Sequence, residues 1–189
     1  MARPRSEDKR DALMAAATRV IAAQGLSAPT AVIAREAGVS NGSLFTYFET
    51  KADLFNELYL ELKTGMATAS VEGLSVQAPL RDQFSRMWSN WMRWATSDPG
   101  KRRALALLGV SDDIAQETRA ASHQAMAEVA RMLERARSRG PMRDAPMEFV
   151  GALMNSLAEA TMDFMVSDPA NADEHCRAGF DALCRMLGC

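Results

Sequence analysis

The sequence predicts an all-α protein, and three observations lead to that fold class. Apolar residues recur at the 3.6-residue helical spacing in nearly every window, whereas no window sustains the two-residue alternation of a half-buried strand. Glycine and proline residues separate these windows at short intervals, as they do at helix ends. With 189 residues, of which 48% are apolar, the chain can also bury a sizeable core.

These patterns predict about nine helices. The first carries an apolar face and ends at Gly25; the residues of that face are Leu13, Ala16, Ala17, Val20 and Ile21. Two short helices follow within residues 30–48. The remaining helices are expected at about 51–70, 79–96, 100–110, 112–138, 146–166 and 172–187.

Residues 30–54 have the pattern of a helix-turn-helix. Ile33, Ala34 and Ala37 form an apolar face, and Gly38 ends that helix. Ser40 is placed to cap a second helix, whose core side is expected to consist of Leu44, Phe45 and Phe48. Two helices joined by a short turn that contains glycine form a motif whose second helix enters the DNA major groove.

The same segment resembles the DNA-binding domain of the TetR family of bacterial transcriptional regulators. The matching positions have the family's order and spacing, and they are Ile33, Ala34, Ala37, Gly38, Val39, Ser40, Gly42, Ser43, Leu44, Phe45, Tyr47, Phe48, Lys51 and Leu54. The resemblance implies a three-helix DNA-binding domain over residues 1–52 and a helical effector-binding and dimerisation domain over residues 53–189. Ala31 departs from the family pattern, which often has arginine or another polar residue shortly after the position of Thr30.

Several residues are placed to contact DNA. In the second helix of the motif the candidates are Asn41, Gly42, Ser43, Thr46 and Tyr47. Asn41 can read adenine through two hydrogen bonds, and the missing side chain of Gly42 lets the helix start approach DNA closely. Lys51 opens the next helix, where its ammonium group and uncapped N–H groups favour a phosphate. The resemblance implies a phosphate contact for Thr30, whereas Tyr47 has the alternative role of a core aromatic residue.

Charge gives no further support for DNA binding. The formal net charge is −2, and residues 1–65 contain equal numbers of basic and acidic residues. Basic residues at the start of the chain form either a DNA-contacting arm or a solvated tail, and they are Arg3, Arg5, Lys9 and Arg10.

The cysteines and the N-terminal segment indicate the cellular compartment. Cys176, Cys184 and Cys189 occur late in the chain without a C-x-x-C spacing, and their odd number suits reduced thiols better than a disulfide framework. The N-terminal segment has no apolar signal-peptide core, and no apolar run approaches about 18 residues. We therefore expect a soluble cytoplasmic protein without a membrane partner.

The helix expected at 79–96 contains all three tryptophans, in a chain with 13 methionines. Tryptophan and methionine side chains around a cavity form an adaptable apolar pocket. The candidate effector-pocket residues are Phe84, Met87, Trp88, Trp91, Leu105, Leu108, His123 and Met126. The alternative is that this helix is ordinary core and that His123 is exposed or satisfied within it, although the family resemblance implies an effector site in this domain.

The last two long helices are where self-association is expected. The candidate dimer-interface residues are Phe149, Leu153, Leu157, Phe164, Phe180 and Leu183. The apolar face of residues 146–166 is wider than one core contact needs, and small residues such as Gly151 and Ala158 let another helix approach. Two helices from each subunit would form a four-helix interface. The alternative is that these helices are buried within their own domain.

These features predict a DNA-binding transcriptional regulator. The expected form is a dimeric repressor that a small apolar or amphipathic effector releases from a palindromic operator on double-stranded DNA; the alternative is a regulator or activator that needs no effector. An enzyme is not expected, because no Ser/His/Asp set, no carboxylates paired near a histidine and no phosphate-binding loop are present. No cofactor is expected either, and no metal, because His175, Cys176 and Cys184 have no fourth ligand at a fitting spacing.

Overall fold

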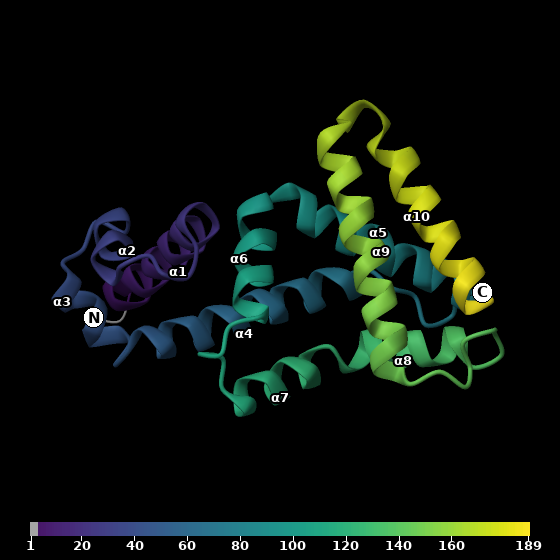
Figure 1. The fold of residues 1–189 in the computed structure, drawn as a ribbon, viewed down its shortest axis with the longest axis horizontal. Coiled ribbons are helices and arrows are strands. Elements are labelled where there is room, and N and C mark those ends of the chain that lie inside the picture. Colours follow the sequence, from purple (N-terminus) through teal and green to yellow (C-terminus); the bar gives the residue numbers. More distant parts are fainter. Residues whose placement is uncertain (1–3) are drawn as a thin grey trace. The chain divides into compact units, whose positions relative to one another are not determined.

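A computed structural model of the protein describes residues 4–189, with side chains from Glu7 onward (Figure 1). Its elements are α1 (Pro4–Gln24), α2 (Thr30–Glu36), α3 (Asn41–Tyr47), α4 (Lys51–Val71), α5 (Leu80–Ser97), α6 (Pro99–Gly109), α7 (Gln116–Ala125), α8 (Ala127–Arg137), α9 (Met147–Ser167), the 3-10 helix η1 (Pro169–Asn171) and α10 (Ala172–Leu187). Within the described residues there is no strand, which confirms the predicted all-α fold class. There are ten α-helices in this range, where about nine were predicted.

The chain divides into two compact units. The first combines the residues up to 64 with residues 98–124, and the second combines residues 65–97 with residues 125–189. The first unit therefore contains α1–α3 and α6, and the second contains α5 and α8–α10. The predicted boundary at residue 52 divides the chain by function, into a DNA-binding domain and an effector-binding and dimerisation domain. The two compact units do not test that boundary, and it stays a prediction.

In the first unit, α1 packs against α2 and α6. The five residues predicted for its apolar face are each at most 5% exposed, namely Leu13, Ala16, Ala17, Val20 and Ile21, and Met14 is buried beside them. The helix ends where predicted, at Gly25, whose φ of +79° lies in the left-handed region that glycine enters without steric cost. The apolar period and one glycine thus determine both the face and the end of α1.

The basic start of the chain is helical in its described part and is not an extended arm. The helix α1 begins at Pro4, and proline is favoured at the first position of a helix. Arg10 forms an ion pair with Glu57 of α4, so its charge is used within the first unit. Arg3 lies outside the described residues, as does the side chain of Arg5, and a DNA contact by these two stays a prediction.

The helix predicted over residues 112–138 is instead a turn followed by two helices. Asn56 of α4 holds the turn, because its side-chain amide donates to the Asp113 carbonyl at 2.8 Å and accepts from the Ala115 N–H at 2.9 Å. These bonds occupy backbone groups that a continuous helix would use, so α7 begins later than predicted. A second break, at Met126, separates α7 from α8.

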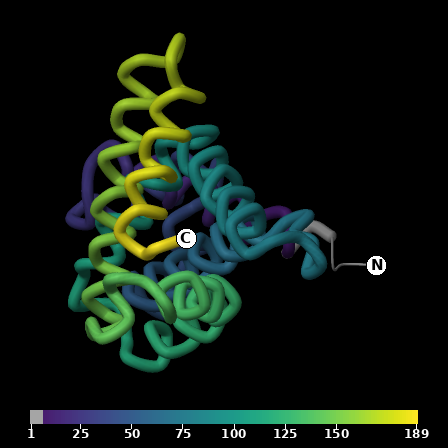
Figure 2. Tube along the Cα trace, turned by 90° about the vertical axis from the view of Figure 1, so that its right-hand side faces the viewer, coloured from purple at the N-terminus to yellow at the C-terminus, as the bar shows by residue number. Residues whose placement is uncertain are grey.

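In the second unit, α5 packs against α8, α9 and α10. The helices α9 and α10 are connected by η1 and run side by side (Figure 2). Phe84, Met87 and Trp88 of α5 have no exposed surface. Trp88 meets Trp91 edge to face, with ring centres 6.0 Å apart, and its indole N–H donates to the Cys176 carbonyl at 3.1 Å. The tryptophan-rich face of α5 is therefore the core of this unit.

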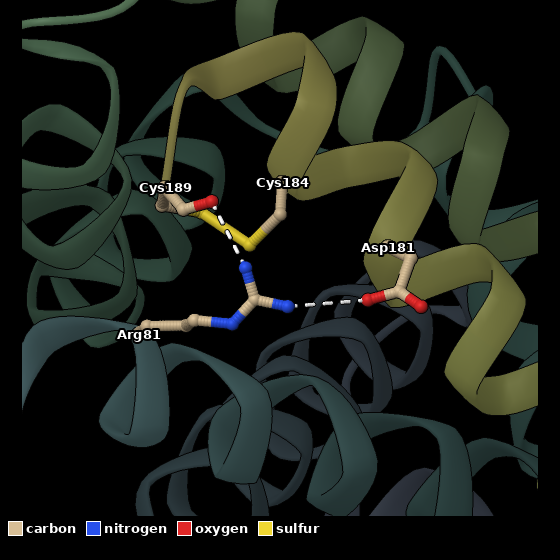
Figure 3. The surroundings of a disulfide bond; sticks show 4 residues. All are labelled: Arg81, Asp181, Cys184 and Cys189. Carbon is tan, nitrogen blue, oxygen red and sulfur yellow. Dashed lines mark hydrogen bonds and ion pairs between the residues drawn. A yellow bond between two sulfur atoms is a disulfide. The ribbon is translucent and has the colours of Figure 1, made fainter.

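Cys184 and Cys189 form a disulfide at the end of α10, contrary to the expectation of reduced thiols (Figure 3). The left-handed Gly188, with φ of +87°, turns the chain back so that the two Cα atoms lie 4.8 Å apart. Arg81 of α5 donates to the Cys189 carbonyl at 3.1 Å and pairs with Asp181 at 3.3 Å. The last turn of the chain is thereby fastened to α10 and to the start of α5.

We predict that Cys189→Ser lowers the free energy of unfolding by about 2 kcal/mol, because the unfolded chain then loses a cross-link that closes a short loop. Urea unfolding followed by circular dichroism measures the change. Dithiothreitol should bring the wild type to the stability of the variant and leave the variant unchanged.

Cys176→Ser is the matched control for this measurement. Burial raises the pKa of the Cys176 thiol, which keeps it protonated and slow to exchange with a disulfide. This control should therefore retain the full response to dithiothreitol. A Cys189→Ser variant as stable as the oxidised wild type would contradict the proposed contribution of the disulfide.

Candidate nucleic-acid interface

The helices α2 and α3 form the helix-turn-helix that the sequence predicts. The turn between them contains Gly38, whose φ of +72° requires the left-handed conformation. The Val39 N–H donates to the Ala34 carbonyl at 2.9 Å and closes the turn. Ser40 then caps α3, as predicted, by accepting a hydrogen bond from the Ser43 N–H at 3.1 Å. The turn and the cap together set where α3 begins.

One side of α3 is anchored in the core and the other faces solvent. Leu44 is fully buried, and Phe48, directly after the helix, is 1% exposed. Of the predicted DNA contacts on this helix, Asn41, Gly42 and Thr46 are exposed, while Ser43 and Tyr47 are half-buried. Gly42 and Thr46, four residues apart, lie opposite the buried Leu44 and form the centre of the outward face.

Phe45 also lies on the solvent side of α3, although the sequence pattern assigns it to the core. Its side chain is 43% exposed. Adjacent residues of a helix point about 100° apart, so a short helix that buries Leu44 turns Phe45 away from the same contact. Phe45 is therefore a functional candidate that the sequence reasoning missed, and the signal for it was this angular separation.

Lys51 and Thr30 are the first residues of α4 and α2. The ammonium group of Lys51 donates to the Leu26 carbonyl at 2.7 Å and lies 5.2 Å from the ring centre of Phe55. One of its three N–H donors is thus used, and two remain for a phosphate. Thr30 is half-buried, and Pro29 before it provides no side-chain cap for α2.

The N-terminus of α4 is less open to an anion than the sequence suggests. The Thr50 N–H donates to the Asp53 carboxylate at 2.9 Å, and the Asp53 N–H donates to the Thr50 hydroxyl at 3.1 Å, which is a reciprocal cap. The Asp53 carboxylate also places negative charge at this helix end. A phosphate contact here therefore depends on the side chain of Lys51 more than on backbone N–H groups.

The predicted effector-pocket residues belong to both compact units. Those in the second unit are Phe84, Met87, Trp88, Trp91 and Met126, and those in the first are Leu105, Leu108 and His123. The members from α5 and α6 are at most 8% exposed, Met126 is half-buried and His123 is exposed.

A cavity of about 490 Å³ lies beside the polar side of α5, between that helix and the segment 73–78. Arg86, Ser89 and Asn90 are among its lining residues, and none of the eight predicted effector residues lines it. The apolar side of α5 is packed instead. The assignment of those eight residues to an effector pocket stays a prediction.

The helix α9 presents an apolar stripe to solvent. Phe149 is 53% exposed and Phe164 is 61% exposed, and Leu153 and Leu157 lie half-buried between them. Their spacing places all four on one face of the helix. Phe164 contacts the ring of His175 on α10, with ring centres 5.6 Å apart, and both phenylalanines remain more than half exposed.

Phe180 and Leu183 of α10, which the sequence assigns to the dimer interface, are buried within the protomer. Phe180 packs against Phe84, with ring centres 6.1 Å apart, and Leu183 has no exposed surface. Gly179 explains this placement, because a Cβ atom there would collide with Thr161 of α9. The close approach of α10 turns its apolar face into the core, so α9 carries the exposed apolar surface.

His175 is paired with Asp168 and not with Cys176. Its Nε2 atom lies 2.9 Å from the Asp168 carboxylate, and hydrogen bonds from Asn171 and His175 lower the pKa of that carboxyl group. Among residues 4–189, no three or more His, Cys, Asp and Glu side chains gather where they could hold a metal ion. In the same range, every helix is too short or too polar to cross a membrane.

The capped, outward-facing α3 after a glycine turn is the recognition element of a helix-turn-helix DNA-binding protein. Residues 13–58 match the family described as bacterial regulatory proteins, tetR family. This segment of the chain is therefore similar to the DNA-binding domain of that family, whose members are transcription regulators.

Solved structures of the family have the same fold. A protein from Shewanella sp. PV-4 assigned to this family is 26% identical, with 93% of this chain and 95% of that chain covered and a TM-score of 0.82. A TetR family transcription regulator from Marinobacter aquaeolei VT8 is 21% identical, with 98% of both chains covered and a TM-score of 0.86. The regulator LfrR from Mycobacterium smegmatis, solved in complex with proflavine, is 17% identical, with 93% and 95% covered and a TM-score of 0.70.

We predict that Gly42→Ala retains or slightly raises the stability of the protein but weakens binding to duplex DNA about tenfold. A Cβ atom at Gly42 would meet nothing within 4 Å, and alanine is the better helix former by up to about 1 kcal/mol. The added methyl group would instead meet DNA lying against the outward face. Urea unfolding measures the first effect, and fluorescence anisotropy with a duplex selected from a random library measures the second.

Gly109→Ala is the matched control, because a Cβ atom at Gly109 in α6 also meets nothing within 4 Å. It should leave the affinity for the selected duplex unchanged. If Gly42→Ala also binds that duplex as tightly as the wild type, DNA does not approach the start of α3.

Proposed function

We propose that the protein is a dimeric cytoplasmic repressor that binds a palindromic operator and is released by a small apolar or amphipathic effector. The observation that carries the DNA-binding part is the geometry of α3, whose outward residues lie between the Ser40 cap and the buried Phe48. One such helix reads few base pairs. Two copies related by a twofold axis, about 34–36 Å apart, match two half-sites of a palindrome.

The proposed division of labour follows the chain. Residues 1–52 contact DNA, through Thr30, Lys51 and the outward residues of α3. Residues 53–189 hold the effector and form the dimer. The exposed stripe on α9 supports the dimer, because Phe149 and Phe164 would be removed from water when the same stripe of a second copy packs against them.

The effector part of the proposal is supported by the proflavine complex of the structurally similar regulator LfrR and by the three tryptophans of α5. Such an effector would act by binding better to a conformation in which the two recognition helices no longer match the half-site spacing. The alternative is a regulator that needs no effector. Saturable quenching of the tryptophan emission of the DNA-free protein by proflavine favours the first form, and unchanged emission favours the second.

Lys51→Gln and Tyr47→Ala should each weaken binding to the selected duplex at least about tenfold while the dimer stays folded. The first removes a charge whose position is set by the Leu26 carbonyl, and the second removes a side chain from the flank of the recognition face. A gel shift measures binding, and circular dichroism with size-exclusion chromatography checks the fold.

Lys63→Gln is the matched control for charge, because Lys63 lies further along α4, over the ring of Tyr59. It should bind DNA almost as well as the wild type. Intact binding by both Lys51→Gln and Tyr47→Ala would show that α3 and the start of α4 are not the DNA-binding surface.

The double variant Phe149→Asp with Phe164→Asp should be monomeric at micromolar concentration, because two carboxylates would be buried without partners in the proposed interface. Light scattering after size-exclusion chromatography measures the mass. Val76→Asp, at an apolar residue that is 84% exposed in the loop before α5, is the control and should remain dimeric. A dimeric double variant would place the interface away from the α9 stripe.

A further inference from the structure

The outward face of α3 contains a large apolar side chain beside an empty position. Phe45 is 43% exposed, whereas the other large apolar residues of this segment, Leu44 and Phe48, are at most 1% exposed. Gly42 precedes Phe45 by three residues and lies on the same side of the helix. A Cβ atom at Gly42 would meet nothing within 4 Å, so the space next to the ring is open.

The hydrogen-bonding capacity of this patch is low. Thr46 lies beside Phe45, and its hydroxyl donates to the Gly42 carbonyl at 3.3 Å, so that proton is used within the helix. The patch formed by Gly42, Phe45 and Thr46 therefore offers mainly apolar surface to whatever approaches it. Asn41, one turn before Phe45, is a second polar residue that is exposed on this part of the helix.

In the DNA major groove, the 5-methyl group of thymine is the apolar feature of the base edges. A phenylalanine ring placed over the edge of guanine, cytosine or adenine would remove hydrogen-bond donors and acceptors of the base from water. The ring offers no hydrogen bonds in exchange, so this placement costs free energy. Against a thymine methyl group the same ring removes apolar surface from water on both sides. The chemistry of the patch therefore favours one base.

We propose that Phe45 reads the 5-methyl group of a thymine in each operator half-site, with Gly42 leaving the space in which that base pair lies against the helix. The inference rests on the proposed function, namely that α3 enters the major groove. Phe45 then determines which base is preferred at its position. Asn41 remains the candidate for hydrogen bonds to an adenine.

The test first selects duplexes from a random-sequence library with the full-length wild-type protein. In the best duplex, each thymidine is then replaced singly by deoxyuridine, which pairs identically and lacks only the methyl group. At one position in each half-site, this replacement should weaken binding by the wild type about fourfold, the value for one buried methyl-sized group. Fluorescence anisotropy at fixed salt concentration measures the affinities.

Variants of Phe45 then test whether its ring is the group that recognises the thymine methyl group. Phe45→Ala should bind the thymidine duplex more weakly and should no longer distinguish it from the deoxyuridine duplex. Phe45→Leu keeps an apolar side chain and should retain part of the discrimination. Val110→Ala, at an exposed apolar residue at the end of α6, should retain all of it.

The outcomes separate this inference from the proposed function. Equal binding of thymidine and deoxyuridine duplexes by the wild type at every position would overturn the inference and leave DNA binding intact. The same would follow if Phe45→Ala kept the discrimination of the wild type. Failure of the wild type to enrich any sequence would overturn the proposed function and this inference together. The wild-type comparison uses no protein variant, so misfolding cannot obscure it.

Discussion

The position of α3 depends on one constraint, which is that a seven-residue helix must bury Leu44 and the following Phe48 in the core of the first unit. The glycine turn at Gly38 and the cap at Ser40 bring the helix to the place where both side chains can be buried. A rotation of the helix by one residue, about 100°, would bury Phe45 and expose Leu44. The residues that α3 buries therefore determine which of its residues face solvent. Those solvent-facing residues are the ones that could contact DNA.

Electrostatic attraction contributes less to this surface than is usual for a DNA-binding protein. The chain carries a net charge of −2, and Arg10 near the N-terminus is paired with Glu57. Asp53 places a carboxylate at the start of α4, directly beside the region where Lys51 would meet a phosphate. In the proposed dimer, affinity would then come mainly from the fit of two recognition helices to two half-sites, so the exposed stripe of α9 would matter for DNA binding.

Features that depend on local chemistry could be predicted from the sequence. The end of α2 at Gly38 and the cap at Ser40 follow from which residues tolerate a left-handed turn or accept a backbone hydrogen bond. Features that depend on distant contacts could not. Asn56, from another helix, prevents a helix at 112–115, and the phase of α3 in the core, not its apolar pattern, exposes Phe45. The burial of Phe180 and Leu183 on α10 also depends on a distant contact, since a glycine at the α9 contact turns them inward.

Hydrogen–deuterium exchange of the full-length protein, with and without the selected duplex, tests most directly whether the outward face of α3 is the DNA-reading surface. The predicted result is slower amide exchange in peptides covering residues 39–47 and the start of α4, with little change in peptides from α9 and α10. Unchanged exchange over residues 39–47, together with protection confined to residues 65–189, would contradict the assignment of α3 as the recognition helix.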